Sequence, residues 1–133
     1  MSPSLELQGV IVARLKSNAA VTALIAGRVY DAVPDKKTFP YVTLGEGDET
    51  GDDADCIDSF EVTFDIDVWS RGVGFPEAKQ IADAVRSALK SPELTLQTNA
   101  LAEFQHRQTR IFRDPDGQTS HAVLTYQAFI EQP

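Results

Sequence analysis

The clearest pattern in the chain is an alternation of apolar and polar residues between Ile57 and Trp69. Every second residue is apolar: Phe60, Val62, Phe64, Ile66 and Val68. The residues between them are mostly acidic or hydroxylated: Ser59, Glu61, Thr63, Asp65 and Asp67. Successive side chains of a strand point to opposite faces of a sheet. The pattern therefore predicts one long β-strand with an apolar face and an acidic face.

Apolar residues recur at helical spacing in three segments. Leu7, Ile11 and Leu15 predict a helix that begins at Ser2-Pro3-Ser4 and ends near Lys16. A second short helix is predicted at 19–26, between a capping Asn18 and Gly27. The strongest pattern lies at 76–90, where one stripe carries Ala78, Ile81, Ala82, Val85 and Leu89. Such a narrow, alanine-rich stripe suits close packing of the helix on a sheet.

Further strands are predicted at 28–33 and from Phe39 to Glu46, and the segments 101–114 and 118–131 flank the turn sequence Asp-Pro-Asp-Gly. If Asp114 pairs with Gln118, Phe112 faces Ser120. One face of this hairpin then carries Phe104, Phe112, Ala122, Leu124, Tyr126, Ala128 and Ile130. The other carries Arg107, Thr109, Arg113, Thr125 and Gln127. A bulge would shift these pairs, so the alternation is a firmer prediction than the register.

The order of these elements predicts the fold class. Residues 1–133, with 42% hydrophobic content, are expected to form one domain. We expect an α+β protein with a mostly antiparallel sheet of four to five strands and two to three helices packed on one face.

Charge changes the picture in one segment. The formal net charge of −8 argues against a surface that binds nucleic-acid phosphates. Acids concentrate at 46–58 and include Asp48, Glu49, Asp52, Asp53 and Asp55. Like charges at this density predict a flexible hairpin loop. A calcium site is the sharper alternative, but the Asp-x-Asp-x-Asp-Gly spacing is absent.

Targeting and redox signals point to a soluble protein made in the cytoplasm. The N-terminus lacks a signal peptide, and no apolar run is long enough to span a membrane. Cys56 is the single cysteine, so no intrachain disulfide can form.

Candidate chemistry is sparse, and we predict no catalytic, cofactor-binding or metal-binding residues. Glu61 and Asp65 would lie about 13 Å apart along their strand, too far for a two-carboxylate mechanism within one strand. His106 and His121 would lie on opposite faces of the hairpin. Two alternatives stay open. One is a metal-dependent enzyme that uses the Asp65 and Asp67 face with a histidine, and the other is an acidic adaptor or inhibitor that mimics nucleic acid.

Several short motifs in order resemble a known family. They are Ala-Leu-Ile-Ala-Gly-Arg-Val-Tyr-Asp at 23–31, Phe-Pro-Tyr-Val-Thr-Leu-Gly at 39–45 and Asp-Ile-Asp-Val-Trp-Ser-Arg at 65–71. The helix at 76–90 and the Arg-Asp-Pro-Asp-Gly hairpin complete the series. Together they resemble the tail-completion proteins of long-tailed bacteriophages, prophages and gene transfer agents, also called tail terminator or tail-to-head joining proteins.

The resemblance implies a non-enzymatic virion assembly protein, assembled in the bacterial cytoplasm and placed at the head–tail junction. Such proteins form a ring, typically a hexamer, that caps the head-proximal end of the tail tube and ends tail polymerisation. The ring docks head-completion or connector proteins, and DNA passes through it without specific binding. The family offers no catalytic residues to carry over.

If the chain forms such a ring, the acidic face of the strand at 57–69 has two candidate roles. Glu61, Asp65 and Asp67 could meet Arg107, Arg110 or Arg113 of the next copy in the ring. Alternatively, the three acids could line the channel and repel the DNA backbone. The acidic loop is a candidate contact for other tail or head proteins.

Overall fold

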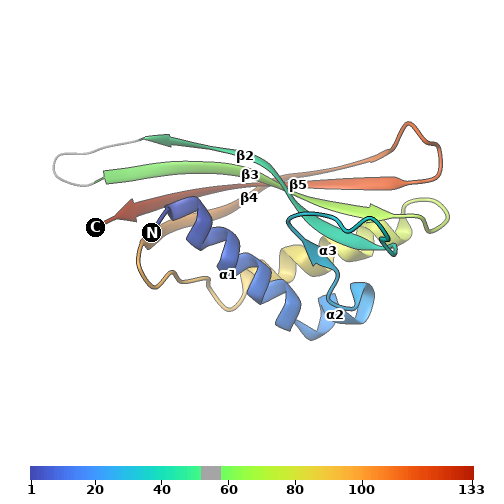
Figure 1. Ribbon diagram of the computed structural model, residues 1–133, viewed down its shortest axis with the longest axis horizontal. Coiled ribbons are helices and arrows are strands. Elements are labelled where there is room, and N and C mark those ends of the chain that lie inside the picture. Colours follow the sequence, from blue (N-terminus) through green and yellow to red (C-terminus); the bar gives the residue numbers. More distant parts are fainter. Residues whose placement is uncertain (52–57) are drawn as a thin grey trace.

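The computed structural model describes residues 1–51 and 58–133. Its helices are α1 (Pro3–Ser17), α2 (Ala19–Ile25) and α3 (Pro76–Lys90). Its strands are β1 (Val29–Tyr30), β2 (Tyr41–Gly51), β3 (Asp58–Ser70), β4 (Ala100–Arg113) and β5 (Ser120–Gln132). The strands form one sheet in the order β1-β2-β3-β5-β4, and of these pairs only β1 with β2 is parallel. All three helices lie on the same side of the long sheet (Figure 1). The α+β prediction is confirmed.

The helix ends follow the signals in the sequence. The Ser2 hydroxyl accepts a hydrogen bond from the Leu5 N–H at 3.3 Å and caps α1. The Asn18 side chain accepts from the Val21 N–H at 3.1 Å and caps α2. At the end of α2, Ala26 and Gly27 both adopt positive φ, 52° and 76°, which stops the helix.

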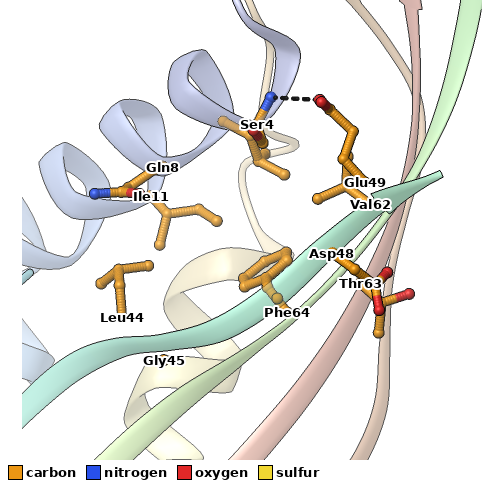
Figure 2. Close-up of a pocket in the computed structure, with 12 residues that line it drawn as sticks. Ser4, Gln8, Ile11, Leu44, Gly45, Asp48, Glu49, Val62, Thr63 and Phe64 are labelled. Carbon is orange, nitrogen blue, oxygen red and sulfur yellow. Dashed lines mark hydrogen bonds between the residues drawn. The ribbon is translucent and has the colours of Figure 1, made fainter. Parts of the chain in front are cut away.

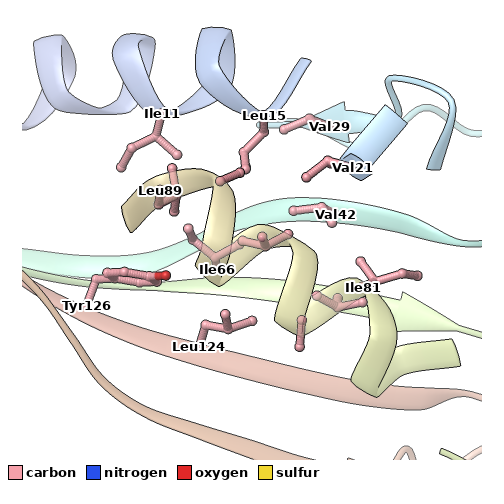
Figure 3. Packing of buried hydrophobic residues seen from close by; sticks show 14 of the residues in the cluster. Ile11, Leu15, Val21, Val29, Val42, Ile66, Ile81, Leu89, Leu124 and Tyr126 are labelled. Carbon is pink, nitrogen blue, oxygen red and sulfur yellow. The ribbon is translucent and has the colours of Figure 1, made fainter. Parts of the chain in front are cut away.

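The core lies between the helices and the apolar face of the sheet (Figure 3). Ile66 at the centre of β3 and Leu124 of β5 are fully buried beneath α3. The α3 stripe is buried as predicted, and Ile11 and Leu15 of α1 close the other side of the core. Val62, Ile66 and Val68 of the predicted apolar face are buried, and Phe60 and Phe64 are partly buried.

The first part of the acidic segment, 46–51, is more ordered than its charge suggested. Glu46, Asp48 and Glu49 belong to β2, which pairs with β3 as far as Gly51. The prediction of a loop from 46 is therefore wrong. Alternation along the strand sends Asp48 and Glu49 to opposite faces, which separates their charges. The predicted contact residues Asp52, Asp53 and Asp55 lie outside the described residues.

The β4–β5 register differs from the prediction near the turn. Phe112 lies opposite His121 instead of Ser120, because the loop after Arg113 is longer than the predicted turn. A bulge between His106 and Gln108 absorbs the extra residue, so His106 still faces Tyr126. The bulge inverts the faces of the residues that follow it in β4. Phe112 thus leaves the core face, and Thr109 and Arg113 move to the helix side.

Candidate functional site

The face of the sheet opposite the three helices carries most of the candidate residues that the structure describes. We call it the open face (Figure 1). Residues directly opposite each other in antiparallel strands share a face. The register therefore assigns to the open face Thr43 and Asp48 of β2, Glu61, Asp65, Asp67 and Trp69 of β3, His121, Thr125 and Gln127 of β5, and Arg110 and Phe112 of β4.

Each of the three candidate acids of β3 is held by a polar residue of β5. The Asp65 carboxylate accepts a hydrogen bond from the Thr125 hydroxyl at 2.8 Å. The Glu61 carboxylate accepts one from the Gln127 side-chain amide. Asp67 Oδ1 lies 2.6 Å from His121 Nε2. These three pairs form a polar ladder along β3 and β5, and all their side chains are partly buried.

The Asp67–His121 pair was missed in the sequence, where the two residues lie 54 positions apart. Both side chains are largely buried, at 13% exposure for His121 and 15% for Asp67. Burial raises the pKa of Asp67, and the hydrogen bond from His121 opposes that rise. The two residues sit diagonally across β3 and β5, and only the exact strand register reveals that they meet.

Trp69 joins this pair to the neighbouring strand. Its ring stacks on His121 with centroids 3.8 Å apart and planes 18° apart. Its indole N–H donates to the Thr43 hydroxyl at 3.0 Å. Tyr41 stacks on the other side of Trp69, and Phe112 packs on His121, so a row of rings crosses four strands of the open face.

The three candidate arginines do not share one surface. Arg110 lies on the open face and reaches over the Phe112 ring at 5.8 Å. Arg113 lies on the helix side and sits over the Phe75 ring at 5.2 Å. Arg107 occupies the bulge of β4 and donates to the side-chain oxygen of Gln105. Among the described residues none of the three forms an ion pair, and all three are exposed.

The C-terminal part of β2, residues 46–51, does not pair with β1, and we call it the free end of β2. This free end meets the start of α1. Glu49 Oε1 accepts from the Ser4 N–H at 3.3 Å, at the positive end of the helix dipole (Figure 2). Beneath this contact lies a groove of about 240 Å³ between α1 and strands β2 and β3. Its walls combine apolar side chains, with Ile11, Leu44 and Phe64 among them, and polar ones such as Gln8 and Asp48 (Figure 2).

A second carboxylate fixes α1 to the chain that leads into β4. The Glu6 carboxylate accepts hydrogen bonds from the backbone N–H groups of Gln97, Thr98 and Asn99 and from the Asn99 side chain. The bond from the Thr98 backbone is the largest cause of a low pKa, about 2 for Glu6. The sequence gives no signal for this role of Glu6, because its partners lie more than 90 positions away.

Comparison with known proteins decides the family. The family model of tail completion protein gp17 matches residues 9–131. The chain belongs to this family. Membership gives the chain a structural role in building a phage-type tail and places it in the virion tail.

Two solved structures support the assignment for this tail completion protein. One is a chain in the virion of a native gene transfer agent particle, with 28% identity, a TM-score of 0.89 and 96% of each chain covered. The other is the gp17 protein of bacteriophage SPP1, with 25% identity, a TM-score of 0.61 and coverage of 94% of this chain and 88% of that one. No curated protein matches significantly.

Of the two histidines, the structure brings His121 and not His106 to the Asp65 and Asp67 face. In residues 1–51 and 58–133, no group of three or more His, Cys, Asp or Glu side chains is placed to hold a metal ion. His106 lies on the helix side, 2.6 Å from the Thr109 hydroxyl, away from Asp65 and Asp67. No helix in these ranges is long and apolar enough to cross a membrane.

Proposed function

We propose that the chain forms a ring, six copies in number, that caps the head-proximal end of a tail tube. The ring stops tube polymerisation and presents a docking surface to head-completion or connector proteins. The observation that carries this proposal is the family match over residues 9–131, supported by near-complete overlap with a chain of a gene transfer agent virion.

The protein acts in this role without catalysis. Its best-formed polar cluster, the Asp67–His121 pair, is stacked against Trp69 and is largely buried. The acids beside it are already hydrogen-bonded to β5, which suits a fixed surface better than a reacting group. Only Arg110 of the three candidate arginines lies on the open face, which favours the lumen over a contact between copies for Glu61, Asp65 and Asp67. Held in place on the open face, these acids would repel the DNA backbone and let DNA pass without binding.

Loss of the gene in the producing cells tests this function. We expect tails of uncontrolled length that carry no heads, because nothing stops the tube or joins it to the head. Negative-stain electron microscopy of the particles measures tail length and the fraction of tails with heads, and a plasmid copy of the gene should restore both. Normal joined particles from the deletion strain would overturn the proposal.

A further inference from the structure

We propose that neighbouring copies join by pairing the outer edge of β4 in one copy with the outer edge of β2 in the next. This inference rests on the proposed ring and names the surface that builds it. In this junction the β4 arginines meet the acids at the free end of β2 in the next copy, instead of the acids on the open face of β3.

Both edges are open in the described chain. β4 is the last strand of the sheet, and its residues from Arg107 to Arg110 are all exposed. On the other side, β1 covers β2 only at Val42 and Thr43. The remainder of β2 has no outer partner among the described residues, and 46–51 are exposed throughout. Unpaired edge strands of this length are templates for pairing with another chain.

The direction of the strands fits such a junction. From β2 through β3 and β5 to β4 every neighbouring pair is antiparallel, so β2 and β4 run in opposite directions. A copy generated by rotation about a ring axis keeps the direction of its strands. The β4 strand of one copy therefore meets β2 of the next in antiparallel orientation, and the alternation continues around the ring without interruption.

Charge favours pairing of β4 with β2 over pairing of two β2 edges or of two β4 edges. The free end of β2 carries Glu46, Asp48 and Glu49, whereas β4 carries Arg107, Arg110 and Arg113, with one acid, Glu103, near its start. Charged edges normally block association. Here two β2 edges repel each other, two β4 edges repel each other, and only the mixed pair attracts. A mixed pair is a head-to-tail contact, the kind that closes into rings.

The rows of the sheet place these charges within reach of each other. Gly47 of β2 and His106 of β4 belong to one row across the four long strands, so Arg107 lies near the level of Glu46. Closing a sheet into a barrel staggers successive strands. A stagger of a few residues in the appropriate direction brings Arg110 to the level of Glu46 and Asp48.

The resulting ring has room for DNA. Four long strands from each of six copies, spaced about 4.8 Å apart and tilted about 40°, close into a barrel with roughly 45–50 Å between opposite backbones. With the helices outside, the open face lines this channel. Glu61 and Asp65 then face the passing DNA, in agreement with the proposed lumen.

Two charge-reversal variants test the junction. The β4-reversed variant carries Arg107→Glu and Arg110→Glu, and the β2-reversed variant carries Glu46→Lys and Asp48→Lys. Multi-angle scattering and native mass spectrometry are run at a concentration where the wild type is a ring, or on purified tail tubes if the ring forms only there. We expect each variant alone to lose the ring and run as the 14.6 kDa single chain. Equimolar mixing should restore rings in which the two variants alternate.

A matched control reverses two exposed charges away from both edges, Lys36→Glu with Lys79→Glu, and should keep the ring. Rings that persist in both edge variants, a control that loses the ring, or a mixture that stays monomeric would overturn the edge junction and leave the proposed function standing. A wild type that forms no ring in solution or on tail tubes would overturn the proposed function together with this inference.

Discussion

The two faces of the sheet are built by different kinds of contact. On the helix side, Ile66 and Leu124 are fully buried against α3, and the interactions there are almost entirely apolar packing. On the open face, the residues next to them in the same strands are Asp65, Asp67 and Thr125, which are half-buried and hydrogen-bonded across β3 and β5. One pair of strands thus serves a core on one side and an ordered polar surface on the other.

The difference between the two faces suggests that one face mainly stabilises the fold and the other mainly serves function. Packing on the helix side is non-directional and scales with the area removed from water. The ladder on the open face is directional, contributes less per contact, and holds charges at fixed positions. We therefore expect substitutions on the helix side to unfold the protein and substitutions on the open face to change what the folded protein does.

Removing a core side chain should give the largest effect. Ile66→Ala deletes a fully buried side chain beneath α3, and we expect the free energy of unfolding to fall by about 2–5 kcal/mol. The control in the same strand is Thr63→Ala on the open face, with an expected loss under about 1 kcal/mol. Urea unfolding followed by the fluorescence of Trp69, the single tryptophan, measures both. Equal losses would contradict the contrast between the faces.

Close approach of β2 to β3 should give the next largest effect. A Cβ on Gly47 would lie 2.6 Å from the Thr63 carbonyl oxygen and 2.8 Å from the Phe64 Cβ, so Gly47→Ala must push the strands apart. We expect a loss of about 1–3 kcal/mol in the same urea measurement. Gly51→Ala in the same strand meets nothing within 4 Å, and its free energy of unfolding should change by about 0.5 kcal/mol or less. A harmless Gly47→Ala would show that the bulge before it adapts.

The helix side of the sheet could be predicted from the sequence because buried positions recur with the period of a helix or a strand. The stripe on α3 and the alternation in β3 each identify buried residues without knowledge of their partners. The open face could not, because its contacts depend on register. The bulge after His106 reverses the faces of Phe112 and Arg113, and no local signal in β4 marks it.

The acidic segment shows a second limit of sequence reasoning. The density of acids at 46–58 suggested a flexible loop, yet Glu46, Asp48 and Glu49 form part of β2. Strand pairing with β3 and the cap that Glu49 gives to α1 outweigh a modest repulsion between exposed charges. Both partners are distant in sequence, so the local composition does not contain this information.

On the helix side, substitution of Glu6 in α1 should give a smaller effect on stability that depends on pH. Its pKa of about 2 in the folded chain lies below the ordinary value of 4.5, so its stabilisation is present above pH 4.5 and is lost as the pH falls toward 2. Glu6→Gln should lower the melting temperature at pH 7, because a neutral amide holds the backbone N–H groups of 97–99 less well. The gap to the wild type should shrink between pH 4.5 and about 2.

Circular dichroism melts at several pH values measure this gap. The control is Glu93→Gln, which neutralises an exposed glutamate in the same connection before β4. A Glu6→Gln deficit that stays constant with pH would mean that packing, and not the charge of the carboxylate, ties α1 to this segment.

Charge reversal on the open face should leave the protein folded and change its function. Glu61→Lys with Asp65→Lys removes two hydrogen bonds to β5, at a cost of about 1 kcal/mol each. If these acids line the lumen, rings of the variant keep their mass, but DNA ejection from the assembled particles slows because the channel now attracts phosphates. Native mass spectrometry and a dye-based ejection assay measure the two properties. Loss of the ring would instead place the acids in the contact between copies, and intact rings with normal ejection would exclude both roles.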